Sequence, residues 1–373
     1  MTSLLNLSTP TLPSSLLTII VTTSPVVSNP STEMLDLLLS SFQLVDGLES
    51  CRKIIVCDGY NIPTSKPVNP KYRRRRIITE QEAIDYETFV SKISGTDLDT
   101  DKQSKDGSKD GSKDDSKDKN KDINKDDNKD DNKDDSNDDK EKQQRRQRRR
   151  TENTDFIIIG KGRRLGFALA LKEALQLVKT EFVMVIQHDW AFLRTIPLVQ
   201  ILNVMQKFPD IVKYVGFPST TSLTYTETTI TKIGSEIRSE MGSREATLKL
   251  PLYPLLMWFD KTHICRTDHY RSFVFEQHEF KPGYFIEDTV FGMFTDVIRQ
   301  NGMSAHEKYG TFLYNDGKGE IISHLHGRRF LTQEQRVECG MPRVAVRCGN
   351  GYVRDAVELF EMHRDDVCDE KVE

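Results

Sequence analysis

The sequence lacks a long hydrophobic run. Its most apolar stretch, Leu16–Val21 followed by Val26 and Val27, is broken by Thr, Ser and Pro and is far shorter than the ~20 residues of a spanning helix. The first residues carry neither the basic region nor the cleavage-like site of a secretory signal. We therefore expect no transmembrane segment and a cytoplasmic location.

Paired cysteines and excess positive charge are also missing. Six cysteines are scattered over 373 residues without a C-x-x-C spacing, which argues against a disulfide framework and a zinc knuckle. The 53 Lys and Arg residues are balanced by 57 Asp and Glu residues, which leaves a net charge of −4. The sequence thus predicts no globally basic surface and no nucleic-acid partner.

Aromatic residues are absent between Phe89 and Phe156. The hydrophobic content of the whole chain is low, at 36%, mainly because this segment contains so few apolar residues. From 97 to 150 the chain cycles through Lys, Asp, Asn, Ser and Gly and ends in the basic block Arg145–Arg150. Such a segment buries too little apolar surface to offset the entropy lost on ordering, so 97–150 is predicted to be a disordered low-complexity insertion. The basic block, like Arg73–Arg76 upstream, is interpreted as the charged edge of a solvated insertion, with nuclear localisation or polyanion binding as the alternative.

The remaining chain is arranged around this insertion. We expect a flexible N-terminus at 1–15, a single folded domain formed by 16–96 and 151–335, and a C-terminal extension at 336–373 with a short helix at Val353–Met362. The two halves are assigned to one domain because each looks incomplete without the other.

Both halves alternate between strand and helix patterns. Before the insertion, Leu17–Thr22 and Lys53–Cys57 are typical of strands, and Thr32–Phe42 between them carries apolar residues at helical spacing. After it, Phe156–Ile159 and the apolar run Phe182–Ile186 are separated by a second helical pattern. This order predicts an α/β fold with a mostly parallel sheet, whose ligands bind beyond the carboxyl ends of the strands.

Acidic residues follow two of these strands. Asp58 comes after the second strand and Asp189 after the central one. A carboxylate in this place can hold Mg²⁺ together with substrate phosphates, or it can simply cap a turn. His188 faces away from Asp189 on an extended chain, so we interpret it as structural.

Two later motifs carry further candidate groups. Glu287 and Asp288 open an amphipathic helix that ends near Asn301, where a carboxylate suits a general base but is also common for helix stability alone. His324 and His326 share one face of an extended segment, a geometry that suits metal or phosphate, and Arg328 beside them could hold a diphosphate.

The order of these motifs resembles the GT-A glycosyltransferases, in particular the inverting family-2-like group. Asp58 resembles the acidic residue that contacts the nucleotide base in that group. Phe182–Trp190 resembles the strand that leads to its Asp-x-Asp metal motif, with Gln187 at the first acidic position. Glu287-Asp288 resembles the Glu-Asp pair before a helix that ends in Arg-x-x-Gly, here Arg299–Gly302.

The resemblance implies a GT-A-like (Rossmann-like) catalytic domain and inverting sugar transfer from a nucleotide-diphosphate-sugar donor to a glycan, protein or lipid acceptor. The residues implied to bind the nucleotide sugar are Asp58, Arg164, Asp189 and Arg328. Those implied to hold Mn²⁺ or Mg²⁺ are Asp189, His324 and His326. The acceptor proton would pass to Asp288, with Glu287 as the second choice.

Two alternatives stay open. Gln187 also suits a catalytically weak relative that binds nucleotide or glycan. The second alternative is another metal-dependent, phosphate-handling α/β enzyme. A nucleotidyltransferase of this kind is disfavoured, because the loop Thr23–Val27 lacks the glycine and the basic residue that such an enzyme carries after its first strand. Between the motifs, Leu252–Trp258 offers either a surface for sugar stacking or core packing, and Ser219–Thr231 is predicted to be an exposed loop.

Overall fold

The computed structural model describes residues 12–62, 78–95, 153–159, 163–225, 248–339, 345–347 and 353–355. The predicted insertion at 97–150 lies outside these residues, as do both basic blocks. The predicted N-terminal segment 1–15 is described from residue 12 onwards, and the extension 336–373 only in short pieces.

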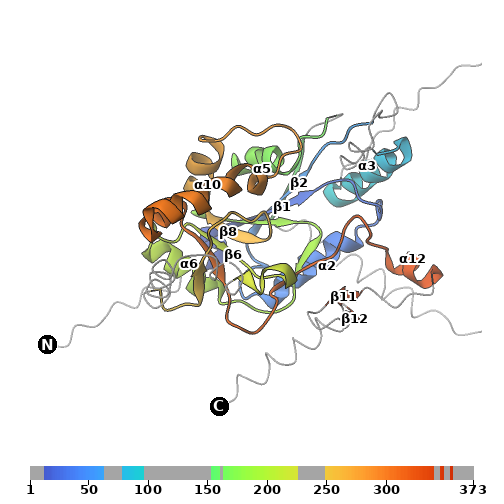
Figure 1. Cartoon of the computed structure of the whole chain (residues 1–373). Helices are drawn as coiled ribbons and strands as arrows, with labels where there is room; N and C mark the ends of the chain where they lie inside the picture. Colours follow the sequence, from blue (N-terminus) through green and yellow to red (C-terminus); the bar gives the residue numbers. More distant parts are fainter. Residues whose placement is uncertain are drawn as a thin grey trace, which may run out of the picture.

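An eight-stranded sheet with the order β3-β2-β1-β4-β8-β6-β9-β7 forms the centre of the described chain (Figure 1). Its first four strands are parallel: β3 (Thr154–Ile158), β2 (Arg52–Cys57), β1 (Leu17–Thr23) and β4 (Phe182–Gln187). The next strand, β8 (His263–Arg266), is antiparallel to β4 and to β6 (Tyr214–Gly216); β6 runs parallel to β9 (Thr311–Tyr314), and the edge strand β7 (Leu252–Pro254) is antiparallel to β9. The sheet is therefore mostly parallel.

Helices cover both faces of the sheet because β1 and β4 bury residues on each side. Ile19 of β1 packs in one apolar cluster with α2 (Glu33–Ser41), α3 (Glu80–Ser94) and α6 (Leu198–Lys207). Ile20, the next residue, packs in the opposite cluster with α5 (Phe167–Leu175) and α10 (Ile286–Asn301). This three-layer arrangement confirms the predicted α/β fold class with a mostly parallel sheet flanked by helices.

The shorter elements connect these layers. The helical ones are α1 (Pro13–Leu16), α9 (Thr267–His269), α11 (His306–Tyr309) and α12 (Gln333–Glu338), with single turns or distorted turns at Phe42–Leu44, Thr220–Ser222, Tyr270–Phe275 and Met303–Ala305. Two small antiparallel sheets pair β5 (Trp190–Phe192) with β10 (Ile322–His324), and β11 (Ala345–Arg347) with β12 (Val353–Asp355). Within the described ranges, no helix is long and apolar enough to cross a membrane.

The predicted helix at Val353–Met362 is wrong at its start. Val353–Asp355 forms β12, which pairs residue by residue with β11, and the remaining residues lie outside the described chain. A helical apolar spacing over so short a segment does not compete with a neighbouring strand that offers hydrogen-bond partners.

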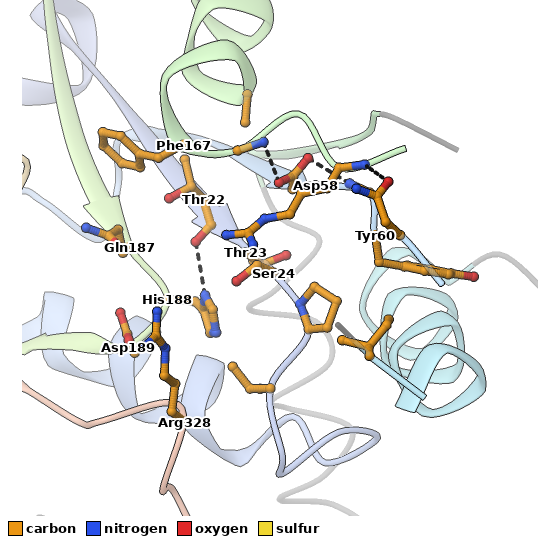
Figure 2. Close-up of a pocket in the computed structure, with 18 of the residues that line it drawn as sticks. Thr22, Thr23, Ser24, Asp58, Tyr60, Phe167, Gln187, His188, Asp189 and Arg328 are labelled. Carbon is orange, nitrogen blue, oxygen red and sulfur yellow. Dashed lines mark hydrogen bonds between the residues drawn. The ribbon is translucent and has the colours of Figure 1, made fainter. Parts of the chain in front are cut away.

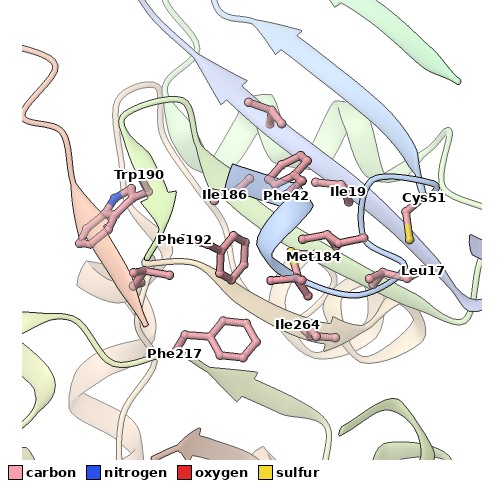
Figure 3. Close-up of a cluster of buried hydrophobic side chains, with 14 of the residues drawn as sticks. Leu17, Ile19, Phe42, Cys51, Met184, Ile186, Trp190, Phe192, Phe217 and Ile264 are labelled. Carbon is pink, nitrogen blue, oxygen red and sulfur yellow. The ribbon is translucent and has the colours of Figure 1, made fainter. Parts of the chain in front are cut away.

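The sheet face covered by α2 carries a dense apolar cluster (Figure 3). Leu17 at the start of β1 is fully buried there. Phe192 lies between Phe42 and Phe217, with ring centroids 6.3 and 6.0 Å away in edge-to-face geometry. This cluster fills the space between α2 and the central strands.

Replacing Leu17 with alanine should lower the free energy of unfolding by about 2–5 kcal/mol, because the surrounding core cannot close the cavity completely. The matched control is Leu177→Ala, since Leu177 is 41% exposed, and it should cost less than about 1 kcal/mol. Urea unfolding followed by circular dichroism measures both. Equal losses would contradict the burial described above.

Candidate functional site

A cleft that is partly open to solvent lies at the carboxyl ends of β2, β1 and β4 (Figure 2). Its walls are the end of β1 with the residues after it (22–26), the residues after β2 (58–61), and the end of β4 with the two residues after it (187–189). The other residues that line it are Ile78, Arg164, Gly166, Phe167, Ala170, Phe285 and Arg328. Parallel strands direct their ends to one edge, which explains why segments so distant in sequence meet here.

Asp58 anchors the wall of the cleft next to β2. Its Oδ1 accepts hydrogen bonds from the N–H groups of Gly59 at 2.8 Å and Leu165 at 2.9 Å, and its Oδ2 accepts one from Gly166 at 2.8 Å. Burial raises the pKa of this carboxyl, and the three N–H groups oppose that effect. A carboxylate offers about four lone-pair directions, so Asp58 retains capacity for one ligand donor.

Glycine is required where the chain enters α5. Gly166 has φ 83° and ψ 172°, a conformation that side chains avoid. A Cβ at this position would lie 2.5 Å from the Cα of Gly283. The N–H of Gly283 donates to the carbonyl of Leu165 at 2.8 Å, so the loop before α10 rests directly on the residues that Asp58 holds.

Aromatic side chains continue this contact to the mouth of the cleft. The rings of Phe167 and Phe285 are stacked with centroids 5.8 Å apart. Phe285 is the residue immediately before α10 and lines the cleft while remaining 38% exposed. The beginning of α10 is thereby fixed at the rim of the cleft.

Asp189 lies at the opposite wall. Its Oδ2 is 2.9 Å from Nε2 of His324, because β10 pairs with β5 and sets His324 opposite Trp190. Burial would raise the pKa of Asp189, but the bond to His324 and the nearby His188 outweigh it and hold this pKa below its ordinary value. Asp189 is therefore ionised at neutral pH.

His326 does not follow the extended geometry expected for it. The strand ends at His324, and His326 has a left-handed backbone with φ 56°. Its ring nevertheless contacts His324, with the two Nδ1 atoms 3.2 Å apart. Gly327 beside it lies so close that a Cβ would be 3.2 Å from Oδ2 of Asp189, and this packing presents the exposed Arg328 to the cleft.

His188, which the sequence predicts to be structural, lines the cleft and is held by the backbone of β1. Its N–H and its Nδ1 both lie near the carbonyl oxygen of Thr22, at 3.0 and 3.1 Å. Since a carbonyl only accepts, Nδ1 carries the proton and Nε2 does not. Burial lowers the pKa of His188 and keeps the ring neutral.

Glu287 and Asp288 occupy the first turn of α10 and differ in their surroundings. The side chain of Glu287 accepts a hydrogen bond from the N–H of Asp260 at 3.3 Å, and the N–H of Glu287 donates to Oδ2 of Asp260 at 3.0 Å. Asp288 is exposed and has no hydrogen-bond or ion-pair partner within the described part of the chain. Neither side chain belongs to the lining of the cleft, although Phe285 before them does.

The structure therefore brings Asp58, Arg164, Asp189 and Arg328 together around one space. Arg164 is held there by its own N–H, which donates to Oδ1 of Asn61 at 3.0 Å. His324 reaches this group through Asp189. Glu287, Asp288 and His326 lie beyond it, next to residues that line it.

Two residues of this region escaped the sequence reasoning. Asp260 carries no motif, and its place became visible only when β8 proved antiparallel to β4. Phe285 stands two residues before Glu287 in a Tyr-Phe-Ile run, so an aromatic pair ahead of an acidic helix start was the available signal. Trp258 is fully buried and belongs to the core, which rules out sugar stacking on this ring.

The predicted exposed loop at Ser219–Thr231 holds for part of its described residues, because Thr220, Thr221 and Thr224 are exposed. Ser219 and Ser222 are instead buried, at 4% and 2% exposure, because they cap each other in a tight turn. Residues 226–231 lie outside the described chain.

The donor atoms beside the cleft fit a divalent cation in chemistry. Mn²⁺ and Mg²⁺ in phosphate-handling sites take one or two protein ligands and complete their shells with substrate oxygens. Asp189 and His324 offer a carboxylate and an imidazole in direct contact. Across the described residues there is no preformed group of three or more His, Cys, Asp or Glu side chains that could hold a metal by itself.

No family model and no curated protein matches the chain. Among solved structures, it is similar to a mannosyltransferase from Pyrobaculum calidifontis in complex with GDP-Man and Mn²⁺, with 11% identity, a TM-score of 0.32 and coverage of 81% of this chain. The match spans 57% of that mannosyltransferase. A mycobacterial protein matches at 13% identity and TM-score 0.32, covering 90% of this chain and 78% of that one.

A CMP:2-keto-3-deoxy-manno-octonic acid synthetase complexed with CTP matches at 8% identity and TM-score 0.30, covering 80% of this chain and 88% of that one. Likenesses of this size do not bear on function. The side chains around the cleft carry the proposal below.

Replacing Gly166 with alanine should destabilise the protein more than the same change at Gly95. Gly95 also has a positive φ, 69°, but a Cβ there meets nothing within 4 Å. We expect a loss of about 1–2 kcal/mol for Gly95→Ala, from backbone conformation alone. Gly166→Ala should cost about 1–3 kcal/mol more, because backbone must move apart.

Urea unfolding of the two variants beside the wild type measures the difference. Similar losses for both glycines would show that the loop before α10 does not rest on Gly166.

Proposed function

We propose that this protein is a glycosyltransferase that moves a sugar from a nucleotide-diphosphate donor to an acceptor hydroxyl by inverting displacement. The observation that carries the proposal is the convergence of Asp58, Arg164, Asp189 and Arg328 on one cleft at the carboxyl ends of parallel strands. The start of α10, with Asp288, adjoins its rim through Phe285.

In this proposal the donor lies across the strand ends. The remaining acceptor position of Asp58 receives an N–H of the nucleobase. Arg164 and Arg328 neutralise the diphosphate, since guanidinium groups pair well with phosphate oxygens.

Asp189 and His324 would hold Mn²⁺ or Mg²⁺ against the diphosphate, with His326 beside His324. Such a cation supplies Lewis-acid stabilisation of the leaving diphosphate. His324 keeps Asp189 ionised before any ligand arrives, which is the protonation state that ligation requires.

Asp288 would accept the proton of the attacking hydroxyl. A bond forms between the acceptor oxygen and the anomeric carbon while the bond from that carbon to the diphosphate oxygen breaks, with inversion at the carbon. The exposed and unpartnered carboxylate of Asp288 suits this role better than Glu287, whose carboxylate already accepts from the Asp260 N–H. The acceptor, a glycan, protein or lipid, would present its hydroxyl at this rim.

The first test is a thermal-shift screen with UDP-glucose, GDP-mannose and dTDP-glucose, each with and without Mn²⁺. A ligand at 100 times its Kd stabilises the folded state by about 2.7 kcal/mol, so one of the donors should raise the Tm, and more so with Mn²⁺. Asp189→Asn should lose the Mn²⁺-dependent part of the shift. Asp46→Asn, at an exposed position, serves as the control and should keep it.

The absence of any shift would refute donor binding. A shift without release of nucleoside diphosphate would favour the alternative of a nucleotide-binding protein with little activity, which Gln187 in place of an acidic residue also suits.

The second test concerns the base. Asp288→Asn should lower release of nucleoside diphosphate from the donor found in the screen by at least about 100-fold, because general-base catalysis is worth that much or more. Its donor Kd, measured by calorimetry, should stay within about threefold of wild type. Asp296→Asn, farther along the same helix, is the matched control. Unchanged turnover in Asp288→Asn, or loss of donor binding, would contradict the assignment.

A further inference from the structure

Asp260 is a buried acid at the same edge of the sheet as the cleft. It precedes β8, and because β8 is antiparallel to β4 its beginning lies next to the carboxyl end of β4. Asp260 is only 5% exposed. A carboxyl group is rarely this buried unless it is paired with other groups.

Three hydrogen bonds connect Asp260 to the surroundings of the cleft. Oδ2 accepts from the N–H of Glu287 at 3.0 Å, and the N–H of Asp260 donates to the carboxylate of Glu287 at 3.3 Å. Its carbonyl accepts from Nε2 of Gln187 at 3.1 Å. Gln187 lines the cleft and Glu287 belongs to α10, so Asp260 joins the cleft wall to the helix that carries Asp288.

The first turn of α10 depends on this external partner. The residue before the helix, Phe285, gives no side-chain cap, although the first N–H groups of a helix lack partners within the helix. Asp260 supplies the missing acceptor from a loop distant in sequence. Its bond with Glu287 is reciprocal, like a capping box built from two separate segments.

We propose that Asp260 is a positioning residue that fixes the first turn of α10, and with it Asp288, against the cleft wall at Gln187. This inference rests on the proposed function. It assigns to Asp260 no contact with donor or acceptor.

The protonation state of Asp260 supports this role. Burial raises its pKa to about 8, and the carboxylates of Glu287 and Asp288 act in the same direction. Tyr214 and Tyr270 also face it, and Lys261 follows it in sequence. At neutral pH the group is therefore uncharged, and it can hold the N–H of Glu287 without repelling the carboxylate of Glu287.

As pH rises through about 8, Asp260 ionises next to Glu287 and the first turn of α10 should loosen. Asp260→Asn keeps an acceptor oxygen at this place and cannot ionise, so it separates positioning from charge. Asp260→Ala removes the acceptor. Asp46→Ala at the surface controls for loss of an aspartate.

The experiment measures hydrogen exchange of the peptide that covers 284–290, and release of nucleoside diphosphate from UDP-glucose, GDP-mannose and dTDP-glucose with Mn²⁺. In Asp260→Ala the exchange at this peptide should speed up by at least about tenfold. Turnover (kcat) should fall by about 10–100-fold with the donor KM within about threefold, since positioning acts on the reacting geometry. Asp260→Asn should restore both and keep its kcat above pH 8, where wild type declines.

Unchanged exchange in Asp260→Ala, or transfer by this variant at the wild-type rate, would overturn the inference while leaving the proposed function intact. Asp260→Asn exchanging as fast as Asp260→Ala would also overturn it. If wild type releases no nucleoside diphosphate at all, the proposed function fails instead, and the exchange data still decide whether Asp260 holds α10.

Discussion

The carboxylate of Asp58 makes the contact on which the rest of the site depends. It binds the N–H groups of Leu165 and Gly166, more than 100 positions later in the chain. These bonds join the end of β2 to the entry of α5, on the far side of the predicted insertion. Because Gly166 in turn supports the loop before α10 through Gly283, one buried acid places three elements around the cleft. Removing the carboxylate oxygens of Asp58 would leave the N–H groups of Leu165 and Gly166 without hydrogen-bond partners, which would lower the free energy of unfolding.

Three acids near the edge of the sheet illustrate how surroundings assign different tasks to one chemical group. Asp58 is buried and accepts three hydrogen bonds from backbone N–H groups, so it serves first as an anchor. Asp189 is kept ionised by His324 and suits ligation of a cation. Asp260 accepts fewer hydrogen bonds than Asp58, and its charged neighbours Glu287 and Asp288 are acidic. Burial therefore keeps Asp260 protonated at neutral pH. Desolvation acts on all three, and the number and charge of the partners decide the outcome.

The sequence predicted the parts of this architecture that repeat a pattern over enough residues. β1 to β4 and α10 were predicted within one or two residues at most ends, because long apolar runs and helical spacing identify them. The strands β6 to β9 are only three or four residues long, too short for a period to be recognised. Asp58 and Asp189 could be placed at a common edge because each follows a parallel strand. Asp260 could not, because it precedes an antiparallel strand, and the direction of β8 is decided by pairing with β4 and not by its own residues.

Gln187 can be understood from the same network. It stands where the resemblance to GT-A glycosyltransferases expects an acidic residue, and its amide donates to the carbonyl of Asp260 at 3.1 Å. An aspartate at 187 would have no N–H to give. It would also add a negative charge beside Asp260 and Glu287, where burial already raises the pKa of both acids. A neutral donor therefore suits this position. The carboxylate that we propose as the cation ligand is Asp189, two residues later, which accepts a hydrogen bond from His324.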